Sequence, residues 1–389
     1  MRAFSSVFSQ ILKLFSRAEF EQQVRLHKAE RHARGVSSWT HFVAMLFCQI
    51  ARAQSLREIC GGLASTEGML SHLGISAPAR SSLSYVNAHR PWELYQTVFY
   101  TLLERCREVA PKHRFKFKNK LLSIDSTTID LCAALFDWAK FRRTKGGVKL
   151  HLLLDHDGCL PHFAVITDAK TDDIQVARFL DFPADSILVF DRGYNDYQWF
   201  HDLTERGIFF VTRMKDRTRY EVLKSRVVLE GGDILLDEDI VLVKVFPGID
   251  PIELRRIEMI NPDGGDNLIF LTNHRRLAAT TIGEIYKDRW KIETFFRTIK
   301  QNLRIKTFVG TSSNALHTQI WTALIAILIL RYLQLKSSFA WSMSNLVALL
   351  RFNLFSYRDL WTWLEHPFAV PISPPDVTQL SLAQFGQQA

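Results

Sequence analysis

The chain has 389 residues, a hydrophobic content of 47% with 12% aromatic residues, and a formal net charge of +9. This length exceeds what one ordinary domain needs, and this composition excludes a disordered or fibrous protein. The charge is uneven, because residues 1–150 carry 23 Lys and Arg against 11 Asp and Glu. A basic amino-terminal part is typical of a module that binds a polyanion, and a solvated basic surface explains the charge equally well.

The cysteines and the apolar segments exclude further classes. Five cysteines are scattered without a Cys-x-x-Cys pair, which argues against a zinc site or a disulfide framework and fits a reducing cytoplasm. The most apolar segment, 320–330, is too short to cross about 30 Å of hydrocarbon and predicts a buried helix. We therefore expect a cytoplasmic protein without a membrane span.

Residues 1–110 predict an all-helical domain. The pattern Ser-Leu-Arg-Glu that begins at Ser55 is a capping box, which predicts that a helix starts there. A turn containing Gly74 separates it from a short helix predicted over 79–90. This arrangement, in which a short helix is followed by a glycine-containing turn and a polar second helix, is the outline of a helix-turn-helix.

The second of these helices supplies the predicted DNA contacts. Arg80, Asn87 and Arg90 would face a groove of the duplex, so we expect residues 1–110 to bind DNA. A solvated helical face explains the same three residues about equally well. Farther along, 111–120 alternates cations with two phenylalanines. These cations could grip phosphates, or the segment could be an exposed edge with its rings in the core.

From residue 121 the pattern changes to strands. An Asp-Gly turn signal at 157–158 predicts a hairpin. A hairpin-linked strand trio followed by helix, strand, helix and strand is the ribonuclease H-like order. The predicted strands cover 121–125, 148–155, 159–167, 186–191 and 207–214.

The remaining segments complete a predicted α/β architecture. Residues 215–275 alternate between apolar and polar and contain Pro-Gly and Asp-Gly-Gly turns, which predicts a mostly β insertion. Helical periodicity resumes near residue 279. We therefore predict a ribonuclease H-like mixed-sheet core in two parts, 111–214 and 276–389, interrupted by the insertion and preceded by the helical domain.

Two aspartates mark the predicted rim of the sheet. Asp125 and Asp191 each follow an apolar strand, where a packed sheet holds side chains rigidly and a shared metal site can form. Hard divalent cations take oxygen ligands, and phosphoryl transfer needs several carboxylates in fixed geometry. Aspartate is also common where loops begin, so these two residues alone are weak evidence.

The predicted helix beyond residue 279 adds a third carboxylate. With about 100° per residue, Tyr286, Arg289, Glu293 and Lys300 share a stripe roughly 60° wide. An apolar stripe lies beside it, so the helix can bury one face and present these four side chains at the rim. Glu would complete the metal ligands, and Arg and Lys would hold phosphates. An amphipathic surface helix with i,i+4 charge pairs would show the same residues.

The spacing Tyr286-x2-Arg289-x3-Glu293-x6-Lys300 is similar to the Y-R-E-K signature of the insertion-sequence-4 family of DDE transposases. Residues 191–194, Asp-Arg-Gly-Tyr, resemble that family's second aspartate motif, and residues 125–128, Asp-Ser-Thr-Thr, resemble its first. The resemblance implies a metal triad of Asp125, Asp191 and Glu293. It also implies that Tyr286, Arg289 and Lys300 engage the backbone of the transposon end.

The resemblance implies a complete activity as well. A transposase of this kind binds the inverted-repeat ends of an insertion sequence and catalyses strand cleavage and strand transfer in cut-and-paste transposition. It would use Mg²⁺, with Mn²⁺ as a substitute, and act on double-stranded DNA as a homodimer in a synaptic complex. We expect a bacterial, nucleoid-associated protein. The alternatives are a ribonuclease H-like nuclease that cuts without strand transfer and a non-catalytic DNA-binding derivative.

Overall fold

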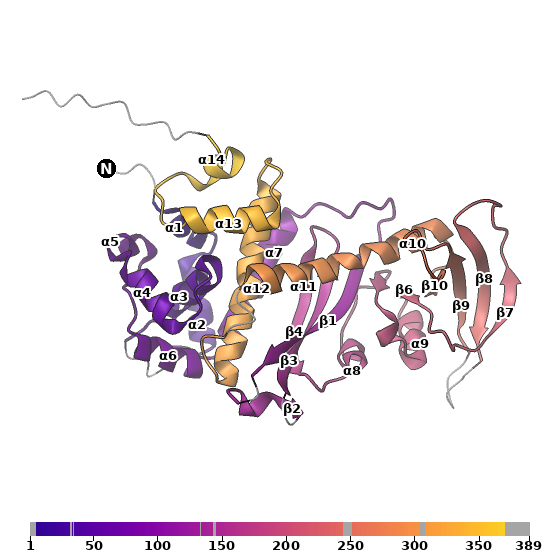
Figure 1. Ribbon diagram of the computed structural model, residues 1–389, viewed down its shortest axis with the longest axis horizontal. Coiled ribbons are helices and arrows are strands. Elements are labelled where there is room, and N and C mark those ends of the chain that lie inside the picture. Colours follow the sequence, from indigo (N-terminus) through magenta and orange to yellow (C-terminus); the bar gives the residue numbers. More distant parts are fainter. Residues whose placement is uncertain are drawn as a thin grey trace, which may run out of the picture.

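The computed structural model describes residues 5–369, apart from 32, 34, 133, 143–144, 244–250 and 304–307. Three parts follow one another along the chain: amino-terminal helices, a large mixed sheet covered by helices, and carboxy-terminal helices that return to the first part (Figure 1). The fold is therefore mixed α/β with a helical amino-terminal region, as the sequence predicted.

The described strands form one ten-stranded sheet. Its order is β4-β3-β1-β5-β6-β10-β9-β8-β7, with the short β2 pairing with part of β3. Strand β1 is antiparallel to β3 and parallel to β5, and β5 is parallel to β6. The strands are β1 (Leu121–Leu131), β2 (Lys140–Arg142), β3 (Lys145–Asp155), β4 (Leu160–Asp168), β5 (Ile187–Val189), β6 (Phe209–Arg213), β7 (Tyr220–Ser225), β8 (Ile234–Leu242), β9 (Glu253–Met259) and β10 (Leu268–Thr272).

The first strand is longer than the sequence predicted. We expected a strand over 121–125 that ends on Asp125, but β1 continues to Leu131, so that prediction was wrong. The extension arises because Ser126 to Leu131 pair residue by residue with the equally long β3. β-Branched Thr127, Thr128 and Ile129 suit this pairing. Asp125 therefore lies in the middle of a paired strand and not at its end.

The segment 215–275 is mostly β, as predicted. Its four strands, β7 to β10, do not form a separate sheet, because β10 pairs with β6 and the other three continue outward from it. In Figure 1 this extension lies at the end of the molecule opposite the amino-terminal helices. Buried ion pairs link two of its strands, among them Arg255 to Asp237 at 2.7 and 2.6 Å.

Helices cover both faces of the sheet. α8 (Asp173–Arg178) and α9 (Tyr197–Glu205) pack with the even-numbered side chains of β1, such as Leu122 and Ile124. α10 (Ala279–Asp288) packs with Leu121, and α11 (Trp290–Asn302) packs with Ile129, on the odd-numbered face. Alternation along β1 thus decides which side chains meet which helices.

The amino-terminal helices share one hydrophobic core with α11 and the carboxy-terminal helices. α12 lies at its centre and contacts α3, α6, α7 and α13 (Figure 1). The capping box is confirmed, since the Ser55 hydroxyl accepts a hydrogen bond from the Glu58 N–H at 3.2 Å. The helices are α1 (Val7–Leu12), α2 (Arg17–Leu26), α3 (Ser38–Ala51), α4 (Leu56–Ala64), α5 (Glu67–Leu70), α6 (Arg80–His89), α7 (Glu93–Glu108), α12 (Ser313–Lys336), α13 (Met343–Asn353) and α14 (Leu360–Glu365).

Helix α12 contains the apolar segment 320–330, every residue of which is buried, so the predicted core helix is confirmed. Its length and composition alone would suit a membrane span. However, 83% of its most apolar window is buried within the fold. The helix is part of the core and indicates no membrane.

The connection 111–120 between the two parts is mainly structural. The rings of Phe115 and Phe117 stack at 5.1 Å and pack against the core under α10. Lys112 and Lys120 pair with Asp157 of the hairpin turn. These two cations neutralise a buried carboxylate, so the alternative of an edge with two Phe in the core describes the segment better than a phosphate grip.

Candidate active site

Two neighbouring parallel strands bring the two aspartates together. Ser123 of β1 is in register with Val189 of β5. Continued by two residues, this register places Asp125 beside Asp191, and adjacent strands lie about 4.8 Å apart. Odd-numbered side chains of both strands face α10, because Leu121 and Val189 pack with that helix. Asp125 and Asp191 are also odd-numbered and continue the same alternation. The sheet therefore presents two carboxylates on one face.

The loop after β5 holds Asp191 in a fixed orientation. Its carboxylate oxygen Oδ1 accepts a hydrogen bond from the Gly193 N–H at 2.8 Å, and the short helical turn Arg192–Tyr194 follows. A Cβ at Gly193 would lie 2.9 Å from that oxygen. A side chain at this position would push the Asp191 carboxylate aside, so the glycine of the Asp-Arg-Gly-Tyr motif preserves its orientation.

The third carboxylate comes from the helix that packs on this face. Helix α10 ends at Asp288 and α11 begins at Trp290, so the single straight helix that we predicted is interrupted at Arg289. Short i→i+3 hydrogen bonds, from the Arg289 N–H to Tyr286 and from the Ile292 N–H to Arg289, tighten the backbone here. We call residues 288–290 the helix joint. Glu293 follows in the first turn of α11.

The guanidinium of Arg289 lies between two of the carboxylates. It donates to Oε1 of Glu293 at 2.6 Å, and it is 3.7 Å from Oδ2 of Asp125. Arg289 is only 7% exposed, so these charges interact away from bulk water. Burial alone would lower its pKa, but the nearby Tyr286, Glu293 and Asp125 raise it, and the group stays charged. The positive charge of Arg289 thus lies beside Glu293 and Asp125, where a metal cation would also be attracted.

The acids of the site disfavour ionisation of Asp125. Burial raises the pKa of Asp125 to about 6, and the negative charges of Asp191 and Glu293 act in the same direction. The Ser126 N–H, at 2.8 Å, and the Arg289 guanidinium oppose this rise in the pKa. The carboxylates are therefore close enough to repel one another. A bound cation would reduce this repulsion.

This raised pKa predicts a pH-dependent stability. A carboxyl group with a higher pKa in the folded than in the unfolded state destabilises the fold above the folded pKa, and the penalty vanishes below the unfolded pKa. Metal-free Asp125→Asn should therefore be more stable than the wild type at pH 7.5, by about 1–2 kcal/mol. The gain should shrink as the pH falls from about 6 toward 4. Denaturant unfolding at several pH values measures it, and a gain that is constant with pH would contradict the assignment.

Tyr286 and Lys300, the other two residues of the predicted stripe, lie on either side of the joint. The Tyr286 ring packs on Phe270 at 5.0 Å, with the Arg289 guanidinium 5.6 Å from its centroid. Lys300 Nζ donates to the carbonyl of Thr128 in β1 at 3.0 Å. The structure thus places Arg289, Glu293 and Lys300 along β1, with Lys300 two turns beyond Glu293, and Tyr286 against β10.

The donor set suits a hard divalent cation, although the side chains do not yet enclose one. Among the described residues, no three Asp, Glu, His or Cys side chains lie close enough together to hold an ion as they stand. Carboxylate oxygens are the ligands that such cations prefer. Repulsion at Asp125 and the guanidinium already beside it both show that this place attracts positive charge.

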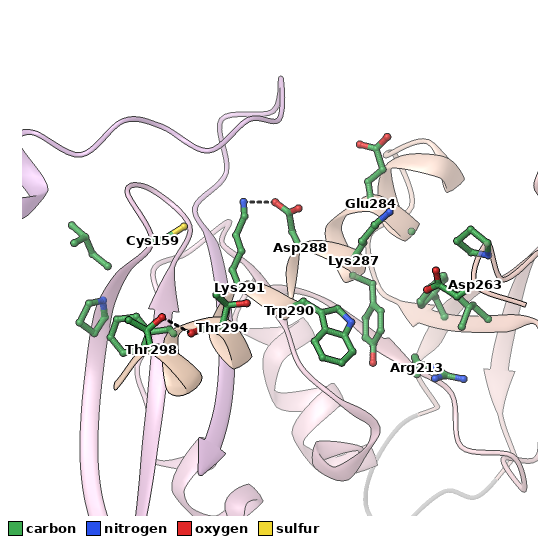
Figure 2. A pocket seen from close by; sticks show the side chains of 18 of the residues that line it. Cys159, Arg213, Asp263, Glu284, Lys287, Asp288, Trp290, Lys291, Thr294 and Thr298 are labelled. Atoms are coloured by element: carbon green, nitrogen blue, oxygen red, sulfur yellow. Dashed lines mark hydrogen bonds and ion pairs between the residues drawn. The ribbon is translucent and has the colours of Figure 1, made fainter. Parts of the chain in front are cut away.

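A groove of about 1010 Å³ runs beside α10 and α11 and is also bordered by residues of β9, β10 and α12 (Figure 2). Figure 2 shows Asp288, Trp290 and Lys291 at its centre, with Arg213 and the side chains of the β9–β10 turn toward one end. None of the three carboxylates lines this groove. The Arg289 guanidinium contacts Glu293 and Asp125 where α11 packs on β1, so we place the candidate site between that helix and that strand.

The structure corrects two predicted DNA contacts in the amino-terminal domain. The predicted second helix is present as α6, but Asn87 and Arg90 are buried, 1% and 4% exposed. Arg90 donates to the carbonyls of Ala29, Val36 and Ser37 at 2.8–3.2 Å. Neither residue faces a groove, because both satisfy polar groups inside the helical core. Arg80 is exposed at the start of the helix, as predicted.

Arg90 and Arg80 should accordingly behave differently when replaced. Arg90→Ala leaves three interior carbonyls without a donor, and an unmade buried hydrogen bond costs about 1–3 kcal/mol. We expect Arg90→Ala to lower the free energy of unfolding by about 3 kcal/mol or more. Arg80→Ala is the matched control and should stay within about 0.5 kcal/mol of the wild type. Denaturant unfolding compares them, and equal stability of both variants would refute the structural role of Arg90.

Some candidate residues escaped the sequence reasoning. Val211 of β6 is in register with Val189, so Arg213, two residues on, lies beside Asp191. On the opposite face of β1, the Ser126 hydroxyl donates to Asp173 at 2.8 Å, and Lys149 contacts the same carboxylate at 3.1 Å. The signal for Arg213 was its place just after the fifth predicted strand. No local pattern pairs Ser126 with Asp173.

Known protein families and known proteins are similar to this chain. A model described as "Transposase DDE domain" matches residues 116–329, and one described as "Domain of unknown function (DUF4372)" matches residues 4–76. The transposase y4zB of Sinorhizobium fredii is 33% identical over 323 residues, covering 82% of this chain and 88% of the relative. A transposase for insertion sequence element IS5377 of Geobacillus stearothermophilus is 28% identical, covering 62% of this chain and 64% of the relative.

A solved structure is similar in outline only. The piggyBac transposase in a synaptic complex with hairpin DNA has a TM-score of 0.49 and 10% identity, covering 96% of this chain and 84% of that chain. The assignment rests instead on the family match, which spans β1 to most of α12 and includes all three carboxylates. Transposase DDE domains generally use divalent metal ions. This chain belongs to the transposase DDE domain family and is a DNA transposase of the insertion-sequence type.

Proposed function

We propose that Asp125, Asp191 and Glu293 are the metal ligands and catalytic residues of this transposase. The observation that carries the proposal is the register of β1 and β5, which sets the two aspartates side by side on the face where α11 brings Glu293. The electrostatics of Asp125 support it, because burial raises its pKa and the negative charges of Asp191 and Glu293 raise it further, as neighbouring carboxylates do.

We propose further that the core is ribonuclease H-like. The strand order β4-β3-β1-β5-β6, with the first three antiparallel and β5 and β6 parallel to β1, supports this assignment. In this scheme 111–214 and 276–389 form the catalytic core, 215–275 is the insertion and 1–110 binds DNA. The Y-R-E-K spacing supports membership of the insertion-sequence-4 subgroup.

Mg²⁺ is the proposed cofactor, with Mn²⁺ able to substitute. Asp125, Asp191 and Glu293 would hold it through carboxylate oxygens, the ligand type that Mg²⁺ selects. When bound, it neutralises charge on the scissile phosphate and favours deprotonation of the attacking water or 3′-hydroxyl. The protein contributes rigid placement: β1 and the Gly193 turn fix the two aspartates, and the helix joint fixes the glutamate.

The basic and aromatic residues around the acids would orient the DNA. We assign Tyr286, Arg289 and Lys300 to the backbone of the transposon end, because Arg289 and Lys300 contact β1 on either side of Glu293 and the Tyr286 ring lies beside the Arg289 guanidinium. Arg80 on the exposed start of α6 is assigned to end recognition. The partners are the transposon ends and the target duplex, and two copies of the chain would pair the two ends as a homodimer on the bacterial nucleoid.

A cleavage and transfer assay with the full-length protein tests this function. The substrate is a labelled duplex carrying the inverted repeat that flanks the gene, incubated with Mg²⁺, Mn²⁺ or EDTA and a target plasmid. We expect metal-dependent nicking at the repeat end and joining of the labelled strand to the plasmid. Nicking without joining would identify a nuclease instead, and binding without nicking would identify a non-catalytic DNA-binding derivative.

A further inference from the structure

A buried polar cluster lies between β1 and the helix joint, next to the candidate site but outside its carboxylates. It consists of Ser123, His156 and Asp288, which are 0%, 3% and 9% exposed. Ser123 lies two residues before Asp125 on the same face of β1, and Asp288 immediately precedes Arg289. We call these three residues the strut, because they connect the strand of one candidate ligand to the joint that carries the others.

His156 occupies the centre of the strut. Its backbone N–H donates to the carbonyl of Leu121 at 3.0 Å, which fixes the hairpin turn on β1. Its ring nitrogen Nε2 is 2.7 Å from the Ser123 hydroxyl. The other ring nitrogen, Nδ1, has no hydrogen-bond partner among the described residues and lies 3.9 Å from Oδ2 of Asp288.

These contacts define the protonation of the ring. Burial lowers the pKa of His156, so the ring is neutral at physiological pH. A neutral imidazole carries one N–H and one lone pair. A lone pair on Nδ1 would face the negative carboxylate of Asp288, whereas an N–H on Nδ1 is attracted to it. The Ser123 hydroxyl therefore donates to Nε2, and Nδ1–H points toward Asp288.

Asp288 joins the two helices at their joint. Oδ2 accepts from Nζ of Lys291, in the first turn of α11, at 2.6 Å, and Figure 2 shows this bond across the joint. Arg114 from the connection lies 3.2 Å from Oδ1. Burial alone would raise the pKa of Asp288, but the contacts with His156, Lys291 and Arg114 hold it below its usual range. The carboxylate stays charged and ties four segments together.

We infer that the strut is a positioning device for strand cleavage: Ser123, His156 and Asp288 set the height and rotation of the helix joint over β1, and thereby hold Arg289 and Glu293 against Asp125. This inference rests on the proposed function of those three residues. Its physical basis is that Arg289 and Glu293 reach Asp125 from a joint whose backbone is tightened, and that Asp288 of this joint faces His156, which is hydrogen-bonded to β1. A displacement of about 1 Å at such a site costs on the order of 100-fold in rate.

Asp288→Asn tests the inference because it keeps the size of the side chain and removes its charge. In single-turnover cleavage of the labelled end duplex, we expect a rate about 10–100-fold below the wild type with end affinity within about 3-fold. The decisive comparison is Asp288→Asn in an Arg289→Ala background. If Asp288 acts through the joint, Asp288→Asn should slow cleavage by less than about 2-fold further in the Arg289→Ala background. If the two residues act independently, their rate losses should multiply.

The matched control is Asp157→Asn in the neighbouring turn. Asp157 is also a buried aspartate, 6% exposed, and it is paired with Lys112 and Lys120 at 3.0 Å, but within the described residues it makes no ion pair or hydrogen bond with the helix joint. We expect it to lose stability and to retain the cleavage rate of its folded fraction. Equal rate losses in Asp157→Asn and Asp288→Asn would reduce the strut to general packing and overturn the inference.

Amide hydrogen exchange of the metal-free and DNA-free protein provides a readout that does not depend on activity. Asp288→Asn and His156→Phe should accelerate exchange in peptides covering 286–296 by about 10-fold, with α12 unchanged, whereas Asp157→Asn should not. Unchanged exchange at the joint in both strut variants would overturn the inference even if cleavage falls. Faster exchange in a protein whose wild type does not cleave DNA would retain the strut and reject the proposed function.

Discussion

Asp125→Asn, Asp191→Asn and Glu293→Gln should each lower the rate of end cleavage by about 1,000-fold or more, with end binding changed by less than about 3-fold. Each amide keeps the shape of the side chain but removes an anionic oxygen ligand. The three acids come from β1, the turn after β5 and α11, so each would supply its oxygen ligand from a different element. Single-turnover nicking and a gel-shift titration on the same labelled duplex measure the two quantities.

Asp130→Asn is the control for this set. Asp130 lies on β1 five residues beyond Asp125 and is exposed, so its loss removes one negative charge from the same strand without touching the site. We expect a cleavage rate within about 2-fold of the wild type, as for most surface changes. If one of the three triad variants cleaved as fast as Asp130→Asn, that residue would be removed from the site.

Replacement of Arg289 should change cleavage and metal affinity in opposite directions. Its guanidinium lies 2.6 Å from Glu293 and 3.7 Å from Asp125, so it competes for the same negative charge as a metal ion. Without DNA, Arg289→Ala should bind Mn²⁺ about 10-fold more tightly, which corresponds to about 1.4 kcal/mol. Its cleavage rate should nevertheless fall about 100-fold, because the phosphate loses its bidentate donor. Calorimetric Mn²⁺ titration and single-turnover nicking measure the two effects.

Two further variants separate charge from geometry at this position. Arg289→Lys keeps the positive charge but cannot form the planar two-point contact, so it should show wild-type metal affinity and about 10-fold slower cleavage. Lys300→Ala removes a cation that donates to the Thr128 carbonyl, away from the acids, and should leave Mn²⁺ affinity unchanged. Weaker Mn²⁺ binding in Arg289→Ala would show that the arginine orders the ligands and does not compete with the metal.

Local sequence patterns were sufficient to predict the strands and the helix that carry the candidate site residues. The apolar runs indicated where β1 and β5 lie, and the helical spacing put Arg289, Glu293 and Lys300 on one face. The sequence did not predict the length of β1, because the pairing of 126–131 with β3 is a contact between separate segments, and the polar residues after Asp125 interrupt the apolar run. It did not predict the interruption at Arg289 either, since every residue from 279 to 302 is compatible with a continuous helix.

Buried polar residues were the main source of error. Asn87 and Arg90 have the chemistry of DNA contacts and the spacing of an exposed helix face. Their partners are in the segment 29–37, in His41 and in Asn314, which no pattern within 79–90 can indicate. The same holds for the strut, whose members come from β1, a hairpin turn and a helix end. In each case long-range folding decided whether a polar side chain faces solvent or the interior.

The central position of α12 has a consequence for how the gene can be expressed. Helices α3, α6 and α7 pack on a helix that is encoded roughly 200 codons later, so at ~5–20 residues per second they wait about 10 seconds or more for their partner on the ribosome. A product truncated before residue 313 would lack this partner and expose the apolar faces of the amino-terminal helices. Such a fragment would be degraded and would not compete for transposon ends. A frameshifted or interrupted copy of this element would therefore be silent, and would not repress its intact relatives.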